Sequence, residues 1–242
     1  MGIPEDQARV ILSEVVVALQ HMHKYGYIHR DVKVENIMLD AEGHVKLVDY
    51  GLAIEFNGDE HEMPMSPMGS LLYMAPELLS ERVGGRHTDW WAVGILAYEI
   101  MTGQSPWSSL SDKKLVRKEI KTVKVMPPRR LSPAAGQFIC SLLSHDRTSR
   151  LGAKDDEELK SAAFFRGVDW RATASRENQA AFVPGRVSTF EGDREEAISA
   201  YTNRPQDGFS TWSLGLPFVK EPPPIQERQV HEQHLIKGIV EL

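Results

Sequence analysis

Residues 29–36 read His29-Arg30-Asp31-Val32-Lys33-Val34-Glu35-Asn36, which places an acid, a cation and an amide within one short stretch. In-line transfer of a phosphoryl group needs little covalent help from a protein, because the main work is to position the attacking hydroxyl and stabilise charge on the moving phosphate. Asp31 could accept a hydrogen bond from that hydroxyl, Lys33 could neutralise the phosphate, and Asn36 could hold a metal ion; these roles are taken from an established template for phosphoryl transfer and do not follow from the residues alone. On its own, His-Arg-Asp is better interpreted as a solvated polar turn. Motifs elsewhere in the chain are therefore needed to distinguish a phosphoryl-transfer loop from such a turn.

Three further motifs follow in order along the chain. Asp49-Tyr50-Gly51 begins thirteen residues after Asn36, and then come Ala75-Pro76-Glu77 and Asp89-Trp90-Trp91-Ala92-Val93-Gly94. With residues 29–36 they resemble the motifs of the large lobe of a eukaryotic protein kinase. Residues 31–36 and 89–94 are similar to the AGC group of serine/threonine kinases. The resemblance extends from about Pro4 to Trp170.

The resemblance implies a serine/threonine protein kinase that uses ATP and Mg²⁺. Asp31 would be the base or hydroxyl-orienting group, and Lys33 would contact the phosphate. Asn36 and Asp49 would be the magnesium ligands. Lys33, Glu35, Asn36 and Asp49 are expected around the nucleotide.

Residues 52–74 are polar and acidic, as is typical of a mobile loop. In the resemblance they form the activation segment, and Ser66 stands three residues before Gly69, where the group carries its activating phosphothreonine. A phosphate placed on Ser66 by an upstream activating kinase would pair with Arg30. An exposed Ser-Pro turn is an equally good interpretation.

Four substitutions, at three places in the chain, distinguish it from the family pattern. Tyr50 replaces the usual phenylalanine and adds a hydroxyl that needs a partner if it is buried. Ser70 replaces the usual threonine beside the substrate, and its hydroxyl can still reach Asp31 and Lys33. Leu71-Leu72 replaces the usual Pro-Glu, which alters the expected pocket for the residue after the phosphoacceptor.

The resemblance also assigns structural and substrate-binding residues. Glu77 is expected to pair with Arg150. Asp89 is expected to hold the backbone of residues 29–36, which form the catalytic loop in the resemblance. Glu35 and Glu99 match positions that bind arginines upstream of the phosphoacceptor, through two-pronged guanidinium–carboxylate contacts. A single glutamate at a helix end is usually a solvated charge, but the pair favours protein substrates with basic residues near the serine or threonine.

The hydrophobic pattern predicts a mainly α fold with a small β hairpin. Helices are expected at about residues 4–24, 89–101, 112–120, 132–143 and 156–163, and strands at 37–39 and 45–48. The hairpin would bring Asn36 and Asp49 to opposite sides of one metal site. Residues 1–170 are expected to form the kinase large lobe, and residues 171–242 an AGC-like extension that is extended or partly disordered and packs weakly.

Composition limits the other function classes. The 242 residues carry a net charge of −6, and the basic residues look scattered, so we expect neither nucleic-acid binding nor a polybasic membrane patch. No apolar run approaches membrane-spanning length, and there is no secretion signal. The single cysteine, Cys140, is expected to be a buried structural thiol in a reducing compartment, the cytoplasm or the nucleus.

Two interpretations stay open at the level of sequence. The chain starts at the first helix of the large lobe, so the resemblance predicts that the Gly-rich loop and the strand-borne lysine of the small lobe are absent. The chain then represents either a serine/threonine kinase by its large lobe or a non-catalytic docking module. In the extension, residues 209–212 only partly imitate the aromatic motif of AGC kinases, and Ser210 and Thr211 are weak candidates for phosphorylation.

Overall fold

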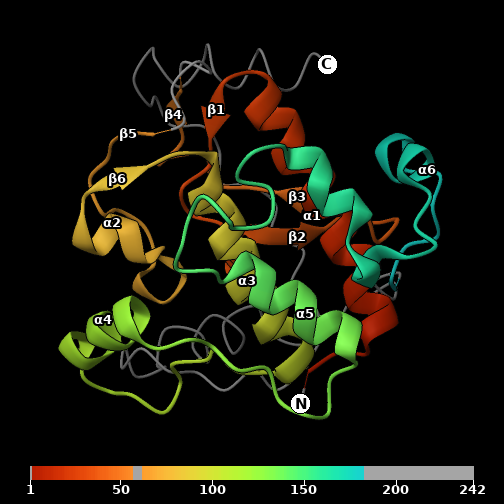
Figure 1. Ribbon diagram of the computed structural model, residues 1–242. Coiled ribbons are helices and arrows are strands. Elements are labelled where there is room, and N and C mark those ends of the chain that lie inside the picture. The colour runs from red at the N-terminus through yellow and green to blue at the C-terminus, as the bar shows by residue number, and fades with distance from the viewer. Residues whose placement is uncertain (1, 57–61, 183–242) are drawn as a thin grey trace, which may run out of the picture.

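The structure is a computed structural model that describes residues 2–56 and 62–182. Two long helices, α1 (Glu5–Lys24) and α3 (Arg86–Thr102), pack against each other, and α5 (Pro133–Leu142) packs along α3 (Figure 1). The described part is therefore helix-rich, as the sequence predicted. None of its helices is both long and apolar enough to cross a membrane.

Three shorter helices lie around this centre. α2 (Pro76–Ser80) packs against α4 (Lys113–Thr122), at the opposite side of the molecule from α6 (Trp170–Ser175), which packs on α1 (Figure 1). Short 3₁₀ turns, η1 to η4, complete the helical structure at Val34–Asn36, Leu71–Tyr73, Asp156–Ser161 and Ala163–Phe165. The helix expected at 156–163 is thus two 3₁₀ turns instead of one helix.

The strands are short and paired in twos. Within the described residues, β2 (Ile37–Leu39) pairs with β3 (Val45–Leu47), which is the expected hairpin. Two further antiparallel pairs join β1 (Tyr27–Ile28) to β4 (Ile54–Glu55) and β5 (Met63–Pro64) to β6 (Val83–Gly84). The sequence did not predict these pairs, because two-residue strands are too short to show alternation.

Helix α1 follows from its sequence. Pro4 presets the backbone before the first turn, where Glu5 and Asp6 oppose the positive end of the helix dipole. Its inner face is fully buried, with Ala8, Leu12, Val15, Val16 and Leu19 each 0% exposed. After the last turn Gly26 takes a φ of 77°, which returns the chain toward β1.

Helix α3 forms the middle of the core. Trp90, Trp91, Val93, Ile95 and Leu96 are at most 1% exposed, so the helix is covered on all sides, as its nearly uniform apolar pattern predicts. It begins at Arg86 instead of Asp89, because the extended Gly85 caps it and accepts a bond from the Thr88 amide at 3.0 Å.

The expectation that Cys140 is buried is wrong. Cys140 lies on the exposed side of α5, whereas Ala135, Phe138, Ile139 and Leu142 occupy the inner side. An apolar helix of ten residues cannot bury every position when only one of its faces meets the core.

The expectation of weak packing beyond Trp170 is wrong for residues 171–182. Asn178 donates to the buried Glu14 of α1 at 2.8 Å, and Arg176 pairs with Asp40 in the hairpin turn. Phe182 packs against the core. These contacts join segments more than 130 residues apart, which no local pattern reveals. Residues 209–212, including Ser210 and Thr211, lie outside the described residues.

Candidate active site

The loop after β1 is held by one carboxylate from α3. Asp89 is 1% exposed, and it accepts hydrogen bonds from the amides of His29 and Arg30, both at 2.9 Å. Arg30 has a φ of 70°, a conformation that non-glycine residues rarely adopt without such support. The expected contact between Asp89 and the loop backbone is therefore present.

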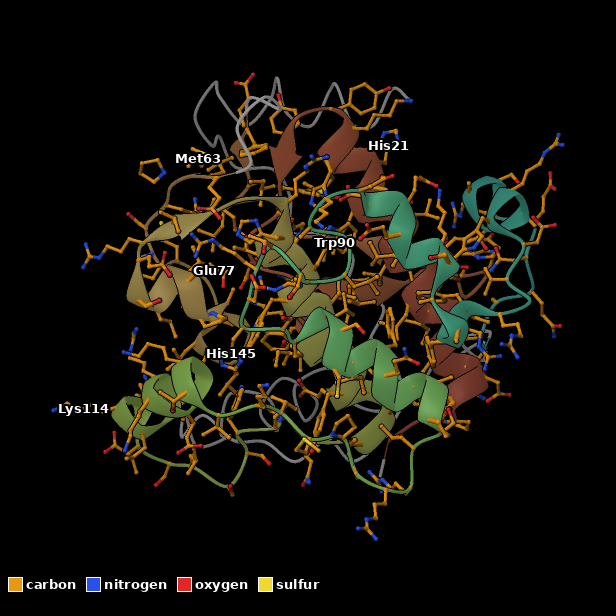
Figure 2. The ribbon with its side chains drawn as sticks, viewed as in Figure 1. His21, Met63, Glu77, Trp90, Lys114 and His145 are labelled. Atoms are coloured by element: carbon orange, nitrogen blue, oxygen red, sulfur yellow. The ribbon has the colours of Figure 1, made fainter. Side chains whose placement is uncertain are left out.

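A buried histidine, which the sequence analysis missed, supports Asp89. The Nε2 of His23 lies 2.9 Å from Asp89, and its Nδ1 lies 3.0 Å from Asp156 at the start of η3. Trp90, labelled in Figure 2, donates to the other oxygen of Asp156 at 2.9 Å. Burial by itself lowers the pKa of His23, but the two carboxylates outweigh it and raise that pKa. His23 sits on an apolar helix far from Asp156 in sequence, so no spacing signal could have found this network.

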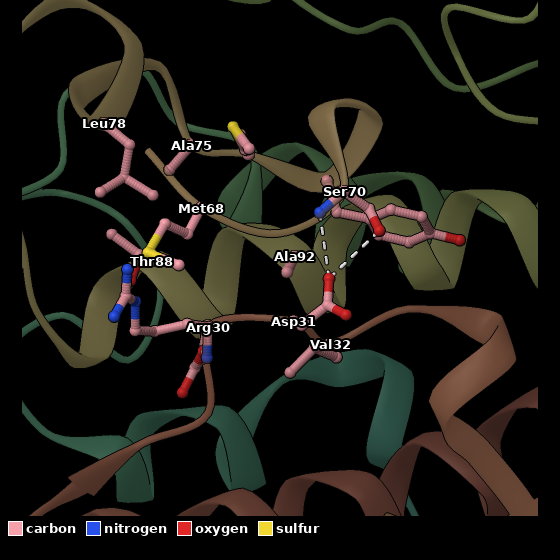
Figure 3. A pocket seen from close by; sticks show the side chains of 12 residues that line it. Arg30, Asp31, Val32, Met68, Ser70, Ala75, Leu78, Thr88 and Ala92 are labelled. Atoms are coloured by element: carbon pink, nitrogen blue, oxygen red, sulfur yellow. Dashed lines mark hydrogen bonds between the residues drawn. The ribbon is translucent and has the colours of Figure 1, made fainter. Parts of the chain in front are cut away.

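Asp31 lies at the centre of a polar cluster. Lys33 Nζ is 2.5 Å from one carboxylate oxygen, and the amide and hydroxyl of Ser70 donate to the other at 3.0 and 3.1 Å (Figure 3). The amide nitrogen of Asn36 bonds the Asp31 carbonyl at 2.8 Å. Burial raises the pKa of Asp31, but the hydrogen bonds from Lys33 and Ser70 outweigh it, so the net pKa is lowered and the carboxylate stays ionised.

Ser70 reaches both residues that the sequence singled out. Besides Asp31, its hydroxyl lies 3.2 Å from Lys33 Nζ. This hydroxyl therefore ties the activation segment to the catalytic loop, across nearly forty residues of sequence. Substitution of the usual threonine by serine keeps this contact.

The hairpin positions the two candidate metal ligands. Asn36 precedes β2 and Asp49 follows β3, and the Val48 amide bonds the Asn36 carbonyl at 3.0 Å, so both residues lie at the open end of one hairpin. Asp49 is exposed and has a φ of 65°. Asn36 is buried, and its amide nitrogen is occupied by Asp31.

This donor set fits magnesium. Mg²⁺ is usually bound by one or two protein oxygen ligands together with substrate phosphates, instead of by a complete protein cage. The described residues contain no cluster of three or more acidic, histidine or cysteine ligands. Asp49 and the amide oxygen of Asn36 are the residues that would hold the ion.

Tyr50 adapts to the position usually taken by phenylalanine. Its hydroxyl donates to the Leu47 carbonyl at 2.7 Å, and its ring meets that of His29 edge-on at 5.3 Å. Burial raises the pKa of Tyr50, so the hydroxyl stays protonated and available as the donor. The added hydroxyl therefore has a partner.

Arg30 and Ser66 lie close together in the activation segment. The Arg30 guanidinium donates to the Ser66 carbonyl at 3.1 Å, and Ser66 itself is exposed. Arg30 also borders a pocket with Met68, Ser70 and Thr88 (Figure 3). The arrangement places a cation against the backbone of the residue that the sequence suggested as a site of phosphorylation.

The end of the activation segment is locked by a buried ion pair. Arg150 is 1% exposed and donates to both oxygens of Glu77, at 2.6 and 3.0 Å. It also donates to the carbonyls of His87 and Ser144, at 2.9 and 3.0 Å. Burial alone would raise the pKa of Glu77, but His87, whose Nε2 lies 3.3 Å from the carboxylate, and the hydrogen bonds from Arg150 lower it to about 2. The expected Glu77–Arg150 pair is therefore present.

Glu35 and Glu99 act on one another electrostatically. Tyr73 of η2 donates its hydroxyl to Glu99 and accepts from the Val34 amide at 3.3 Å. Burial raises the pKa of Glu99, and the charge of Glu35 raises it further, despite the bond from Tyr73. The two carboxylates therefore share one acidic region next to the catalytic loop.

The comparisons with known proteins agree with this geometry. A model of the protein kinase domain matches residues 1–164. The chain belongs to the protein kinase family. Ribosomal protein S6 kinase alpha-4 of Mus musculus is 42% identical over 187 residues, covering 74% of this chain and 24% of that protein.

Two further relatives come from distant organisms. Ribosomal protein S6 kinase beta of Caenorhabditis elegans is 42% identical over 183 residues, and serine/threonine-protein kinase AtPK1/AtPK6 of Arabidopsis thaliana is 40% identical over 182 residues. Each match covers 74% of this chain, and 33% and 38% of those proteins. This kinase chain thus spans about a quarter to two-fifths of the length of these three relatives.

Proposed function

We propose that the chain provides the large lobe of a serine/threonine kinase that transfers the terminal phosphoryl group of ATP to protein hydroxyls. The observation that carries the proposal is the orientation of Asp31, whose carboxylate is fixed by Lys33 and Ser70 at the surface of a small pocket. A carboxylate held ionised in this way can accept a hydrogen bond from an attacking hydroxyl.

Each neighbouring residue has a role in the same reaction. Lys33 would stabilise the negative charge of the transferred phosphoryl group, and Asn36 and Asp49 would hold Mg²⁺. The ion supplies charge stabilisation for the phosphates when it is bound. Asp89 acts indirectly, because it fixes the backbone that carries Asp31.

We further propose that substrates carry basic residues near the acceptor. Burial and the charge of Glu35 raise the pKa of Glu99, and an incoming guanidinium would relieve this cost of ionising Glu99. An arginine peptide would thus replace a repulsion between two acids by two attractions. We propose the cytoplasm or the nucleus as the site of action, and Ser66 as a site for an upstream kinase.

The test is phosphate transfer from labelled ATP to serine peptides, by the chain joined behind the small lobe of a related kinase. We expect activity that needs Mg²⁺, is abolished in Asp49→Asn with the fold retained, and favours arginine before the acceptor. The double variant Glu35→Ala with Glu99→Ala should lose the arginine preference while keeping activity on a neutral peptide. Normal transfer by Asp49→Asn would contradict the metal assignment, and complete inactivity of the unaltered protein would favour a docking module.

A further inference from the structure

Helix α4 gathers cations that look scattered in the sequence. Lys113, Lys114, Arg117, Lys118 and Lys121 are all exposed, and none forms a salt bridge with another described residue. The expectation of dispersed basic residues is wrong for this helix. A net charge of −6 hides the cluster, because most of the acidic residues lie outside this helix.

The five cations occupy one side of α4. At 3.6 residues per turn, 113, 117 and 121 form one row and 114 and 118 form the next, so together they cover an arc of about 140°. Val116 and Ile120, which are 2% and 0% exposed, fall outside this arc, beside the edge that Lys113 forms. The only acid within the helix, Glu119, falls outside the arc.

The helix is fixed with this side outward. Val116 and Ile120 belong to the core, α4 packs against α2, and His145 lies 2.9 Å from the Ile120 carbonyl. Lys114 points away from the body of the molecule at its edge (Figure 2). The charged side is therefore a permanent feature of the surface and needs no rearrangement to be reached.

Apolar side chains border the cations. Leu115 is 49% exposed, Val123 is 42% exposed and Met126 is 77% exposed, which makes them three of the five large hydrophobic residues exposed in the described part. Lys124 lies between the last two and is exposed as well. On a lipid surface, the cations would contact anionic headgroups and the apolar side chains would enter the boundary between the headgroups and the acyl chains.

We propose that α4 and the residues that follow it form a peripheral binding surface for anionic lipid membranes. Clusters of four to eight Lys or Arg on an amphipathic helix have the charge density to attract anionic headgroups. Five of the six cations of the surface are lysines, which act as compact point charges suited to a diffuse negative plane.

An acidic protein partner fits the surface less well. Lysine is depleted at protein–protein interfaces, where arginine with its two-pronged geometry is enriched. The negative charge of the rest of the chain does not prevent lipid binding, since charges farther than about 8 Å are largely screened at physiological salt. Peripheral binding also needs no membrane-spanning helix.

The test is co-sedimentation of the full chain with vesicles. The probes are vesicles of phosphatidylcholine alone and vesicles of phosphatidylcholine and phosphatidylserine in equal parts. We expect binding only to the anionic vesicles, weakening as salt is raised. Replacing the five α4 cations by glutamine should reduce the partition coefficient at least about tenfold, given the contribution of each cation near a charged surface. Leu115→Ser with Met126→Ser should weaken binding without changing its salt dependence.

A matched control removes the same amount of charge elsewhere. Lys24, Lys46, Lys154, Arg166 and Arg171 are exposed and form no salt bridge among the described residues, so their five glutamine replacements change the net charge equally. This variant should keep vesicle binding. Equal loss in both variants, or no binding to anionic vesicles, would overturn the proposal. So would α4-dependent binding to soluble polyglutamate or duplex RNA without vesicle binding, which would assign the surface to another class of partner.

Discussion

Hydrogen bonds from the side chains of Lys33, Asn36 and Ser70 fix the orientation of the Asp31 carboxylate. One carboxylate oxygen is taken by Lys33 and the other by Ser70, which comes from a different part of the chain. Because Ser70 also contacts Lys33, a single hydroxyl fixes the acid and the cation relative to each other. The activation segment therefore fixes Asp31 and Lys33 through the side chain of Ser70.

Ser70→Ala should lower turnover by about tenfold or more, because a hydrogen bond to a charged group contributes about 1.5–3 kcal/mol. Ser70→Thr should retain activity, since it keeps the hydroxyl. Both are compared by phosphate transfer at saturating ATP in the chain joined to a small lobe. Equal activity of the alanine and threonine variants would show that the Ser70 hydroxyl does not orient Asp31.

The Glu77–Arg150 pair predicts a specific dependence of stability on pH. The folded protein lowers the pKa of Glu77 from its ordinary 4.5 to about 2. The contribution of ionised Glu77 to the stability of the fold is therefore fully present above pH 4.5, and it is lost as the pH falls toward about 2. The pKa difference corresponds to about 3 kcal/mol.

Glu77→Gln should therefore lower the free energy of unfolding by about 3 kcal/mol at neutral pH. The difference in the free energy of unfolding between the variant and the unaltered protein should become smaller as the pH is lowered. Urea unfolding between about pH 6 and pH 3 measures this gap. A gap that stayed constant over that interval would show that ionisation of Glu77 does not stabilise the fold.

At the scale of elements, the hairpin is held from outside by the segment after α6. Glu14 accepts bonds from His44 at 2.8 Å, from the Val45 amide at 2.6 Å and from Asn178 at 2.8 Å. The hairpin that carries Asn36 and Asp49 is thus anchored to α1 and to residues 176–182. This segment contributes to the geometry of the site without touching it.

Gly43 offers a test of this packing. It has a φ of 89°, and a Cβ added there would lie 2.2 Å from the Phe182 carbonyl. Gly167 is the matched control, since it has a φ of 87° and nothing within 4 Å. Both alanine variants suffer about the same backbone strain.

Gly43→Ala should therefore lower the free energy of unfolding by about 1–3 kcal/mol more than Gly167→Ala, because only the first displaces a neighbouring segment. Denaturant unfolding of the two variants gives this difference. An equal decrease in the free energy of unfolding in both variants would show that residues 180–182 can move aside without loss of stability.

The sequence predicted the elements that have local signals. Helix α1, the β2–β3 hairpin, the Ser132-Pro133 start of α5 and the Gly103 end of α3 all follow from capping residues or periodicity. The β1–β4 and β5–β6 pairs, the packing of α6 and the exposure of Cys140 depend on contacts between distant segments. Contacts of this kind cannot be predicted from the pattern of residues within a short stretch of sequence.

The candidate site shows the same division. The motif spacing singled out Asp31, Ser70 and Asp89, and the structure brings them together. His23 and Asp156 were missed because a lone histidine on an apolar helix looks like an ordinary core residue. Their network becomes visible only when η3 is placed beside α1 and α3.

At the scale of the whole molecule, the buried network of His23, Asp89 and Asp156 connects the helical core to the loop that carries Asp31. α3 provides Asp89 for the loop at one end and Glu99 for the acidic region near the other. The proposed lipid-binding surface lies on α4, a separate helix. The residues proposed for substrate choice and for lipid binding therefore lie on different elements.

The central claim is that Asp31 acts on the acceptor hydroxyl in phosphate transfer. The most direct measurement is the single-turnover rate of transfer from ATP to a serine peptide, for the chain joined to a small lobe and for its Asp31→Asn variant. We predict a rate about 10²- to 10⁴-fold lower in the variant, with the far-ultraviolet circular dichroism unchanged. A folded Asp31→Asn protein that transfers phosphate at the unaltered rate would contradict the claim.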